Sequence, residues 1–148
     1  MYSDYMGALG RDEGVELDFT GGPIANTFHA HRILHYVQEH RGSEAALKTL
    51  ESLYEQYFCQ RKHPSSAEAL IEACLAAGLN EDEARKVVGD ESEEAAETKL
   101  AIREQTGNEV DSVPYIVFEG KRRDFTLIGA KEIAEYVKTL AQVVKEAS

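Results

Sequence analysis

The sequence predicts an α/β fold in which helices outnumber strands. The predicted elements follow the order helix, strand, five helices, β-hairpin and helix. The first hairpin strand, YIVFE at 115–119, is apolar on both faces, which is typical of a strand inside a sheet that helices cover. A chain of 148 residues, 43% of them hydrophobic, is long enough to bury a core. We therefore expect one domain over 1–148.

The N-terminal segment predicts a helix, a strand and a turn. The helix covers 2–12 and ends before Gly14. VELDF at 15–19 alternates apolar and acidic residues, which is the pattern of a strand with one buried face. TGGPIAN at 20–26 contains two glycines and a proline, which favour a turn. Asn26, the last residue of this turn, is a good N-cap for the helix that follows.

Five predicted helices fill the middle of the chain. Cap residues and glycines separate them, and acidic residues in the first turn of the fourth favour that helix through its dipole. The helices cover about 27–41, 43–58, 66–76, 80–88 and 91–106, and Ser92 or Asp90 would cap the last. Within the second helix, Tyr54, Tyr57 and Phe58 have the spacing of core aromatic residues.

The C-terminal segment predicts a hairpin and a last helix. Strands YIVFE and FTLIG flank the turn GKRRD, and the final helix covers about 130–146. Pro114 directly precedes the first strand, a place where a residue without an N–H group is tolerated.

Composition and charge exclude several classes of function. The net charge of −11 disfavours nucleic acid as a partner, because phosphate binding requires clustered Lys and Arg. No apolar run approaches the roughly 20 residues that cross a membrane, and the N-terminus lacks the pattern of a signal peptide. Cys59 and Cys74 lie 15 residues apart, a spacing that matches neither a redox pair nor a metal site. We expect two reduced thiols in helices, a cytoplasmic protein and no cofactor.

Three segments carry a resemblance to a known family. GPIANTFHAHRIL at 22–34 contains an Asn-Thr-x-x-Ala-His-Arg pattern, and two longer segments cover 45–88 and 107–140. In this order they resemble the DsbA-like thioredoxin domains of the FrnE type, a group related to 2-hydroxychromene-2-carboxylate isomerases. The resemblance implies a thioredoxin-like fold with a helical insertion over about 27–106. It also implies that the Val113–Pro114 peptide bond is cis.

The chain departs from the family at its N-terminal end. The family places a first strand and a Cys-x-x-Cys turn ahead of the Asn-Thr pattern, whereas only 25 residues precede Asn26 here. We therefore expect an N-terminally truncated member without that strand and dithiol. Disulfide exchange requires a thiolate of lowered pKa and a second thiol that resolves the mixed disulfide, so we expect no such activity.

Candidate site residues follow mainly from the resemblance. It implies that Val113 and Pro114 contact a substrate, although they can equally serve only to shape the turn. Thr27 is a further substrate-binding candidate, because helix N-termini bind anions, and simple capping is its alternative role. Asn26, His31 and Tyr115 are the candidates for acid–base or orienting groups.

We expect no metal site on the predicted helix at about 27–41. His31 and His35 are four residues apart on one helix, which is a spacing that can hold a metal. The sequence offers no third ligand at a useful distance along the chain, so we predict structural or exposed histidines instead.

Three functions remain open from the sequence. The first is a redox-inactive binding or assembly module, or a product whose longer form carries the dithiol. The second is a cofactor-free isomerase or cyclase that acts on a small molecule in the thioredoxin cleft. The third is a disulfide oxidoreductase that uses Cys59, and the absence of a partner cysteine argues against it.

The expected loss of the first strand has a consequence for assembly. The sheet would be left with unpaired edges on VELDF and YIVFE, and an unpaired apolar edge is a template for another chain. The two strands could pair directly, the sheet could stay split, or a second copy could supply the partner. We expect a homodimer, with a small molecule or a peptide as a further ligand and neither a nucleic acid nor a membrane as a partner.

Overall fold

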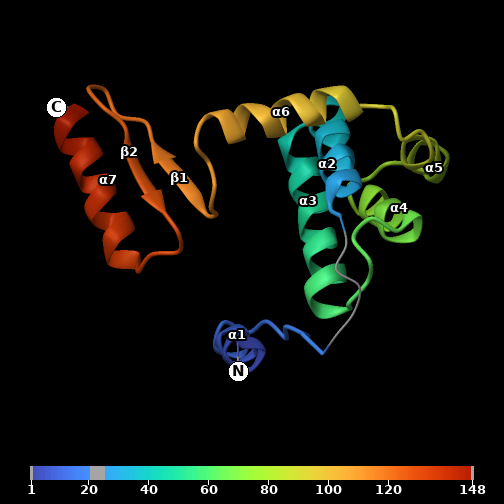
Figure 1. Cartoon of the computed structure of the whole chain (residues 1–148), viewed down its shortest axis with the longest axis horizontal. Helices are drawn as coiled ribbons and strands as arrows, with labels where there is room; N and C mark the ends of the chain where they lie inside the picture. The colour runs from blue at the N-terminus through green and yellow to red at the C-terminus, as the bar shows by residue number, and fades with distance from the viewer. Residues whose placement is uncertain (1, 21–25, 148) are drawn as a thin grey trace. The chain divides into compact units, whose positions relative to one another are not determined.

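The computed structural model describes residues 2–20 and 26–147. The chain divides into two compact units, Met1–Leu100 and Ala101–Ser148, which we call the helical unit and the hairpin unit. Figure 1 labels the elements of both, apart from one π-helical turn. They are α1 (Tyr2–Asp12), α2 (Phe28–Arg41), α3 (Ser43–Tyr54), the π-helical turn η1 (Glu55–Cys59), α4 (Ala67–Ala76), α5 (Glu81–Gly89), α6 (Ala95–Gly107), β1 (Tyr115–Phe118), β2 (Phe125–Ile128) and α7 (Ile133–Ala147).

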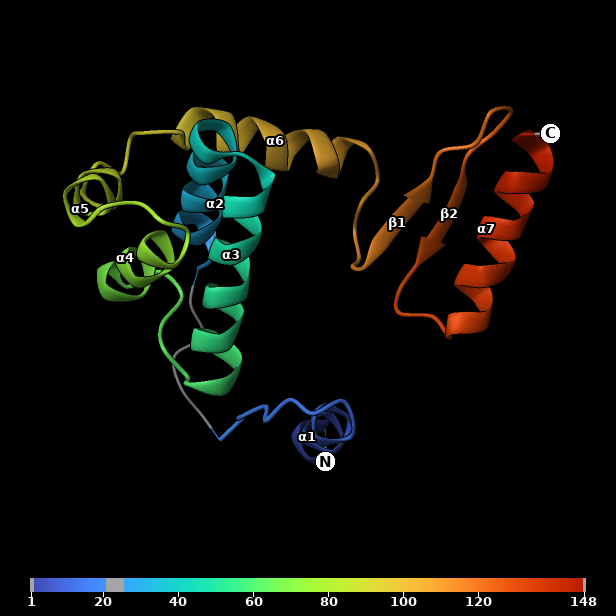
Figure 2. The same ribbon diagram turned by 180° about the vertical axis from the view of Figure 1, so that it is seen from behind.

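Helices α2 to α5 form the body of the helical unit. Helix α3 packs against α2 and α4, and α4 packs against α5, as the view from behind in Figure 2 also shows. Side-chain caps set two of the helix starts. Ser66 accepts a hydrogen bond from the Ala69 N–H at the start of α4, and Asn80 accepts one from the Glu83 N–H at the start of α5. Helix α6 begins in this unit and ends in the hairpin unit.

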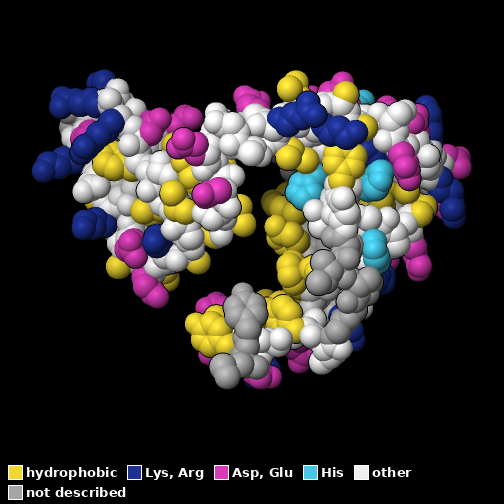
Figure 3. All heavy atoms as spheres, in the orientation of Figure 1, with side chains coloured by type: hydrophobic (Ala, Val, Ile, Leu, Met, Phe, Trp, Pro, Cys, Tyr) yellow, Lys and Arg dark blue, Asp and Glu magenta, His cyan; other side chains and the backbone are white. Residues whose placement is uncertain are grey.

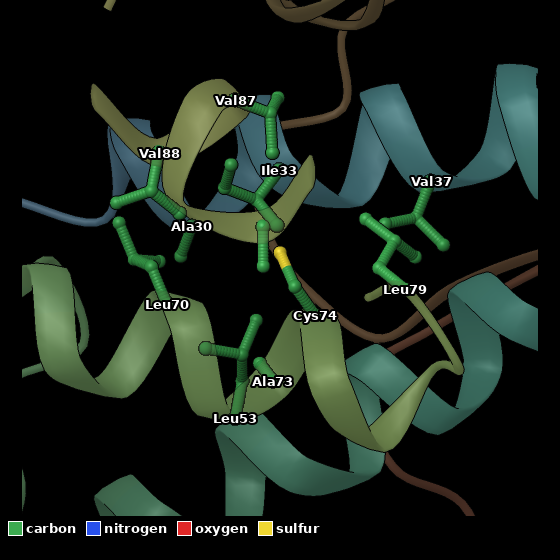
Figure 4. Close-up of a cluster of buried hydrophobic side chains, with 11 residues drawn as sticks. Ala30, Ile33, Val37, Leu53, Leu70, Ala73, Cys74, Leu79, Val87 and Val88 are labelled. Carbon is green, nitrogen blue, oxygen red and sulfur yellow. The ribbon is translucent and has the colours of Figure 1, made fainter. Parts of the chain in front are cut away.

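The core of the helical unit is one cluster of buried apolar side chains (Figure 4). Its members come from α2 to α5 and the turns between them, and burial of each large aliphatic side chain contributes about 1.5–3 kcal/mol. They are Ala30, Ile33, Val37, Leu53, Leu70, Ala73, Cys74, Leu79, Ala84, Val87 and Val88. The segment predicted as a helical insertion therefore has a hydrophobic core of its own.

A buried arginine links α2 to the end of α5. Arg32 is fully buried, and its guanidinium donates to the carbonyl oxygens of Val87 at 2.9 Å, Val88 at 3.3 Å and Glu93 at 3.2 Å. The last carbonyls of a helix have no partner within the helix, and a positive charge is favourable at that end. Arg32, from the Asn-Thr-x-x-Ala-His-Arg pattern, thus caps α5.

The predicted strand at 15–19 is wrong. This segment has no strand in the structure, and its backbone bonds elsewhere: the Val15 N–H donates to the Gly10 carbonyl at 2.7 Å, and the Asp18 N–H donates to the Phe58 carbonyl at 2.8 Å. The side chain of Leu17 lies against Gly10, where a Cβ atom would come within 2.8 Å of its Cγ. An alternating pattern becomes a strand only beside a partner strand, and here a helix and a helical turn take that place.

Two further predictions in the helical unit need correction. Tyr54 and Tyr57 are exposed rather than in the core, and Phe58, which is half-buried, packs edge-on against both rings. Helix α6 begins at Ala95 rather than at 91. The Asp90 carboxylate accepts from the N–H and the hydroxyl of Ser92, and residues 91–94 form a turn ahead of the helix.

The hairpin unit holds an antiparallel pair of strands and a helix. Tyr115 lies opposite Ile128 and Phe118 opposite Phe125, and α7 packs against β1. The sheet formed by the described residues has these two strands only, in the order β1–β2. No helix within the described residues is long and apolar enough to cross a membrane.

Candidate functional site

The loop ahead of β1 is the first candidate, because the resemblance implies substrate binding there. The peptide bond between Val113 and Pro114 is cis. The Pro114 carbonyl accepts from the Gly129 N–H at 2.8 Å, which fastens the loop to the residue after β2. Val113 is 82% exposed, and Tyr115 is half-buried at the first position of the strand. The loop therefore presents an apolar side chain to solvent from a fixed backbone.

The start of α2 brings three other candidates together. The Asn26 carboxamide oxygen accepts from the Phe28 N–H at 2.8 Å, and the Asn26 carbonyl accepts from the Ser65 hydroxyl. Thr27 occupies the N-cap position without a side-chain cap bond, and its carbonyl lies 2.8 Å from Nδ1 of His31. The Asn26 side chain therefore caps the start of α2, whereas the Thr27 side chain does not take the capping role expected as its alternative. Tyr115 belongs to the hairpin unit.

His35, four residues after His31 on α2, has an acidic neighbour. Nδ1 of His35 lies 2.9 Å from Oε2 of Glu94, which is an ion pair when the ring is protonated. Among residues 2–20 and 26–147, no group of three or more His, Cys, Asp or Glu side chains is arranged to hold a metal ion.

The two cysteines lie in separate surroundings. Cys74 is fully buried in the core on α4, and burial raises the pKa of its thiol to about 11, an effect that the nearby Arg32 charge partly opposes. Cys59 is half-buried at the last residue of η1. Both are free thiols. Cys74 lies in the second half of α4 and not at the helix N-terminus, the position that lowers a thiol pKa.

The structure also forms a pocket that sequence reasoning missed. Its volume is about 730 Å³, and it lies between α1, residues 16–20 and Cys59, with Arg11 and Asp18 among the lining side chains. Hydrogen bonds from the Thr20 hydroxyl at 2.7 Å and the Thr20 N–H at 2.9 Å hold the pKa of the Asp18 carboxyl below its ordinary value. Small-molecule pockets are mostly apolar, whereas many of these lining groups are polar or charged.

No sequence signal points to this pocket. It depends on the contact of residues 15–20 with α1 and η1, and the Arg61 guanidinium extends that contact by donating to the Thr20 hydroxyl at 3.0 Å. The residues joined by these hydrogen bonds are up to 41 positions apart in the chain, and none of them belongs to a recognisable motif.

Comparison with known proteins gives the same fold. Residues 1–141 match the DSBA-like thioredoxin domain family. Among solved structures, the chain is similar to "a putative protein disulfide isomerase from Nitrosomonas europaea", with 15% sequence identity and a TM-score of 0.77. The similarity covers 98% of this chain and 72% of that one, and it concerns the fold alone. A comparison with curated proteins found no match. Because the family match spans nearly the whole sequence, this chain belongs to the DsbA-like thioredoxin domain family.

Proposed function

We propose that this chain is a binding module of the DsbA-like family that does not exchange disulfides. The observation that carries the proposal is the state of the two cysteines. Burial raises the pKa of the Cys74 thiol to about 11, so this side chain stays a protonated thiol at pH 7. Cys59 is a free thiol, and a single cysteine has no resolving partner for a mixed disulfide.

The surface of the hairpin unit supports binding as the role. Hydrophobic side chains (yellow) are visible on this unit in Figure 3. Val113 and Ile133 are 82% and 80% exposed, and Val117, Ile128 and Val137 are also exposed. The helical unit also exposes large apolar side chains, but they are denser along the shorter hairpin unit, and such a concentration favours an interaction site. Two free thiols also fit a reducing compartment, so we place the protein in the cytoplasm as part of the same proposal.

The isomerase alternative gains no specific support. His31 and Asn26 have local backbone contacts, and Tyr115 lies in the other unit. Their catalytic roles stay predictions, and a binding module remains the proposed function.

An insulin-reduction assay tests the absence of disulfide exchange. Dithiothreitol reduces insulin slowly, and a thiol oxidoreductase accelerates the resulting precipitation. We expect micromolar wild-type protein and the double variant Cys59→Ser/Cys74→Ala to give the same rate as buffer. Acceleration by the wild type that the double variant loses, while circular dichroism shows the variant folded, would overturn the proposal.

A further inference from the structure

We propose that two copies of this chain associate through the outer edge of β1, which pairs antiparallel with the same edge of the second copy. The two hairpins then form one four-stranded sheet in the order β2–β1–β1–β2. This inference rests on the proposed binding function and specifies its partner and surface.

The hydrogen-bond pattern of the hairpin identifies the edge. The Gly129 N–H donates to the Pro114 carbonyl, so residues 114 and 129 are a hydrogen-bonded pair of the ladder. Such pairs alternate along an antiparallel ladder, so Ile116 and Phe118 bond to β2. The N–H and C=O groups of Tyr115 and Val117 therefore point away from β2.

This edge is complementary to itself. Its outward groups are two residues apart, and a two-fold axis at Ile116 places Tyr115 of one copy opposite Val117 of the other. Each such pair can exchange two hydrogen bonds, and the axis generates the pair twice. Among the described residues, no hydrogen bond outside the hairpin ladder reaches the backbone of Tyr115 or Val117.

The side chains at this edge favour association as well. Tyr115, Val117 and Ile128 share one face of the hairpin, and Val117 and Ile128 are each 48% exposed. The opposite face, which includes Ile116 and Phe118, is half-buried on the side of α7. Pairing of two β1 strands moves Val117 from the edge of a two-stranded sheet to the middle of a four-stranded one, where more of its surface is covered.

The two edges of the hairpin differ in protection. Charged residues and prolines keep natural edge strands from pairing. Neither strand contains a charged residue, although Glu119 follows β1, Asp124 precedes β2 and Pro114 precedes β1. The strands differ in their central outward-facing residue, which is the apolar Val117 on β1 and the polar Thr126 on β2. The outer edge of β1 is therefore the one that invites a partner strand.

The charge distribution is compatible with a second copy as that partner. Residues 101–148 contain seven Lys or Arg and eight Asp or Glu, whereas residues 1–100 contain nine and nineteen. Two copies repel each other strongly through their acidic helical units and hardly at all through their nearly neutral hairpin units. A contact between hairpin units is therefore the one that a pair of identical chains tolerates best.

Two matched proline substitutions test the inference. Val117→Pro and Thr126→Pro alter directly opposite residues, and each removes an N–H that points away from the hairpin. Sedimentation equilibrium of the wild type is expected to show a 16.4 kDa chain that forms dimers at micromolar concentration. We expect Val117→Pro to weaken the dimer at least tenfold and Thr126→Pro to change it less than threefold. A monomeric wild type, or equal effects of both substitutions, would overturn the inference.

Amide exchange of the wild type provides a second readout that needs no variant to fold. Exchange at Tyr115 and Val117 should slow as protein concentration rises through the dimerisation range, while exchange at Ile116 and Phe118 should not change. Equal concentration dependence at all four amides, or none, would contradict pairing at this edge. The insulin assay is independent of these results. A monomeric chain that also fails to accelerate insulin reduction would contradict the proposed dimer but not the proposed absence of disulfide exchange.

Discussion

Cys74 gives the stability of the protein a specific dependence on pH. Burial raises the pKa of its thiol from an ordinary value of 9.0 to about 11, so the folded state holds this proton more tightly than the unfolded state. The resulting stabilisation is fully present below pH 9 and is lost as the pH rises to about 11. Two pKa units correspond to about 2–3 kcal/mol.

We therefore expect the free energy of unfolding of the wild type to fall between pH 9 and 11 more steeply than that of Cys74→Ala. Urea denaturation followed by circular dichroism at several pH values measures both. Tyrosine and lysine residues also titrate in this range in both proteins, so the difference between the two slopes reports on Cys74. A Cys74→Ala variant with the same slope as the wild type would show that the thiol is not shielded from solvent.

Arg32 should contribute far more to stability than an exposed arginine of the neighbouring helix. Arg32→Met leaves three buried or partly buried carbonyl groups without their donor, and we expect a loss of about 2–4 kcal/mol. Arg85→Met, which breaks an exposed ion pair with Glu81, should change stability by less than about 0.5 kcal/mol. Urea denaturation compares the two variants, and equal costs would refute the capping role of Arg32.

At the level of single residues, the sequence predicted local roles better than tertiary ones. Asn80 was identifiable as a cap because its partner is only three residues away. The role of Arg32 depends on carbonyls that are 55 to 61 positions distant, and no local pattern encodes such a contact. The pocket beside Cys59 could not be predicted for the same reason. The loop at Val113 was identified only through the family resemblance.

At the level of elements, the turn between β1 and β2 requires a glycine at its first position. A Cβ atom on Gly120 would collide with the Arg123 carbonyl oxygen, and the Gly120 N–H also donates to the Asp124 carboxylate at 3.1 Å. Gly120→Ala should therefore destabilise the hairpin by about 1–3 kcal/mol. Amide exchange of β1 and β2 measures this.

Gly107→Ala is the matched control for the turn. Gly107 is the last residue of α6, and apart from its chain neighbours and its own helix backbone no atom of the described residues lies within 4 Å of the position that its Cβ would take. This substitution should leave exchange in the hairpin unchanged. Unchanged exchange in Gly120→Ala as well would show that the turn rearranges without cost.

The prediction of elements succeeded and failed for identifiable physical reasons. Helices α2 to α5 follow from periodic apolar residues and caps, which act within a few turns of one helix. A strand depends on a distant partner, so the alternation in VELDF predicted one where the backbone bonds to Gly10 and Phe58 instead. The spacing of Tyr54 and Tyr57 identified a common side of the helix but not whether other residues cover it.

At the level of the whole molecule, the two units divide charge and apolar surface unequally. The helical unit combines most of the net charge with a well-packed core. In the hairpin unit, α7 buries Thr139 while leaving Ile133, Val137 and Leu140 exposed. A nearly neutral unit with exposed apolar groups is suited to binding, and an acidic unit limits which surfaces can approach one another.

A redox titration tests most directly whether this DsbA-like chain works without a disulfide. The protein is equilibrated with thiol–disulfide buffers from about −300 to about −120 mV, which spans the reduction potentials of known exchange catalysts. Free thiols are then alkylated in denaturant, and mass spectrometry measures how many have reacted. We predict that Cys59 and Cys74 form no intramolecular disulfide at any potential. A two-electron transition to a Cys59–Cys74 disulfide within this range, in folded protein, would contradict the account.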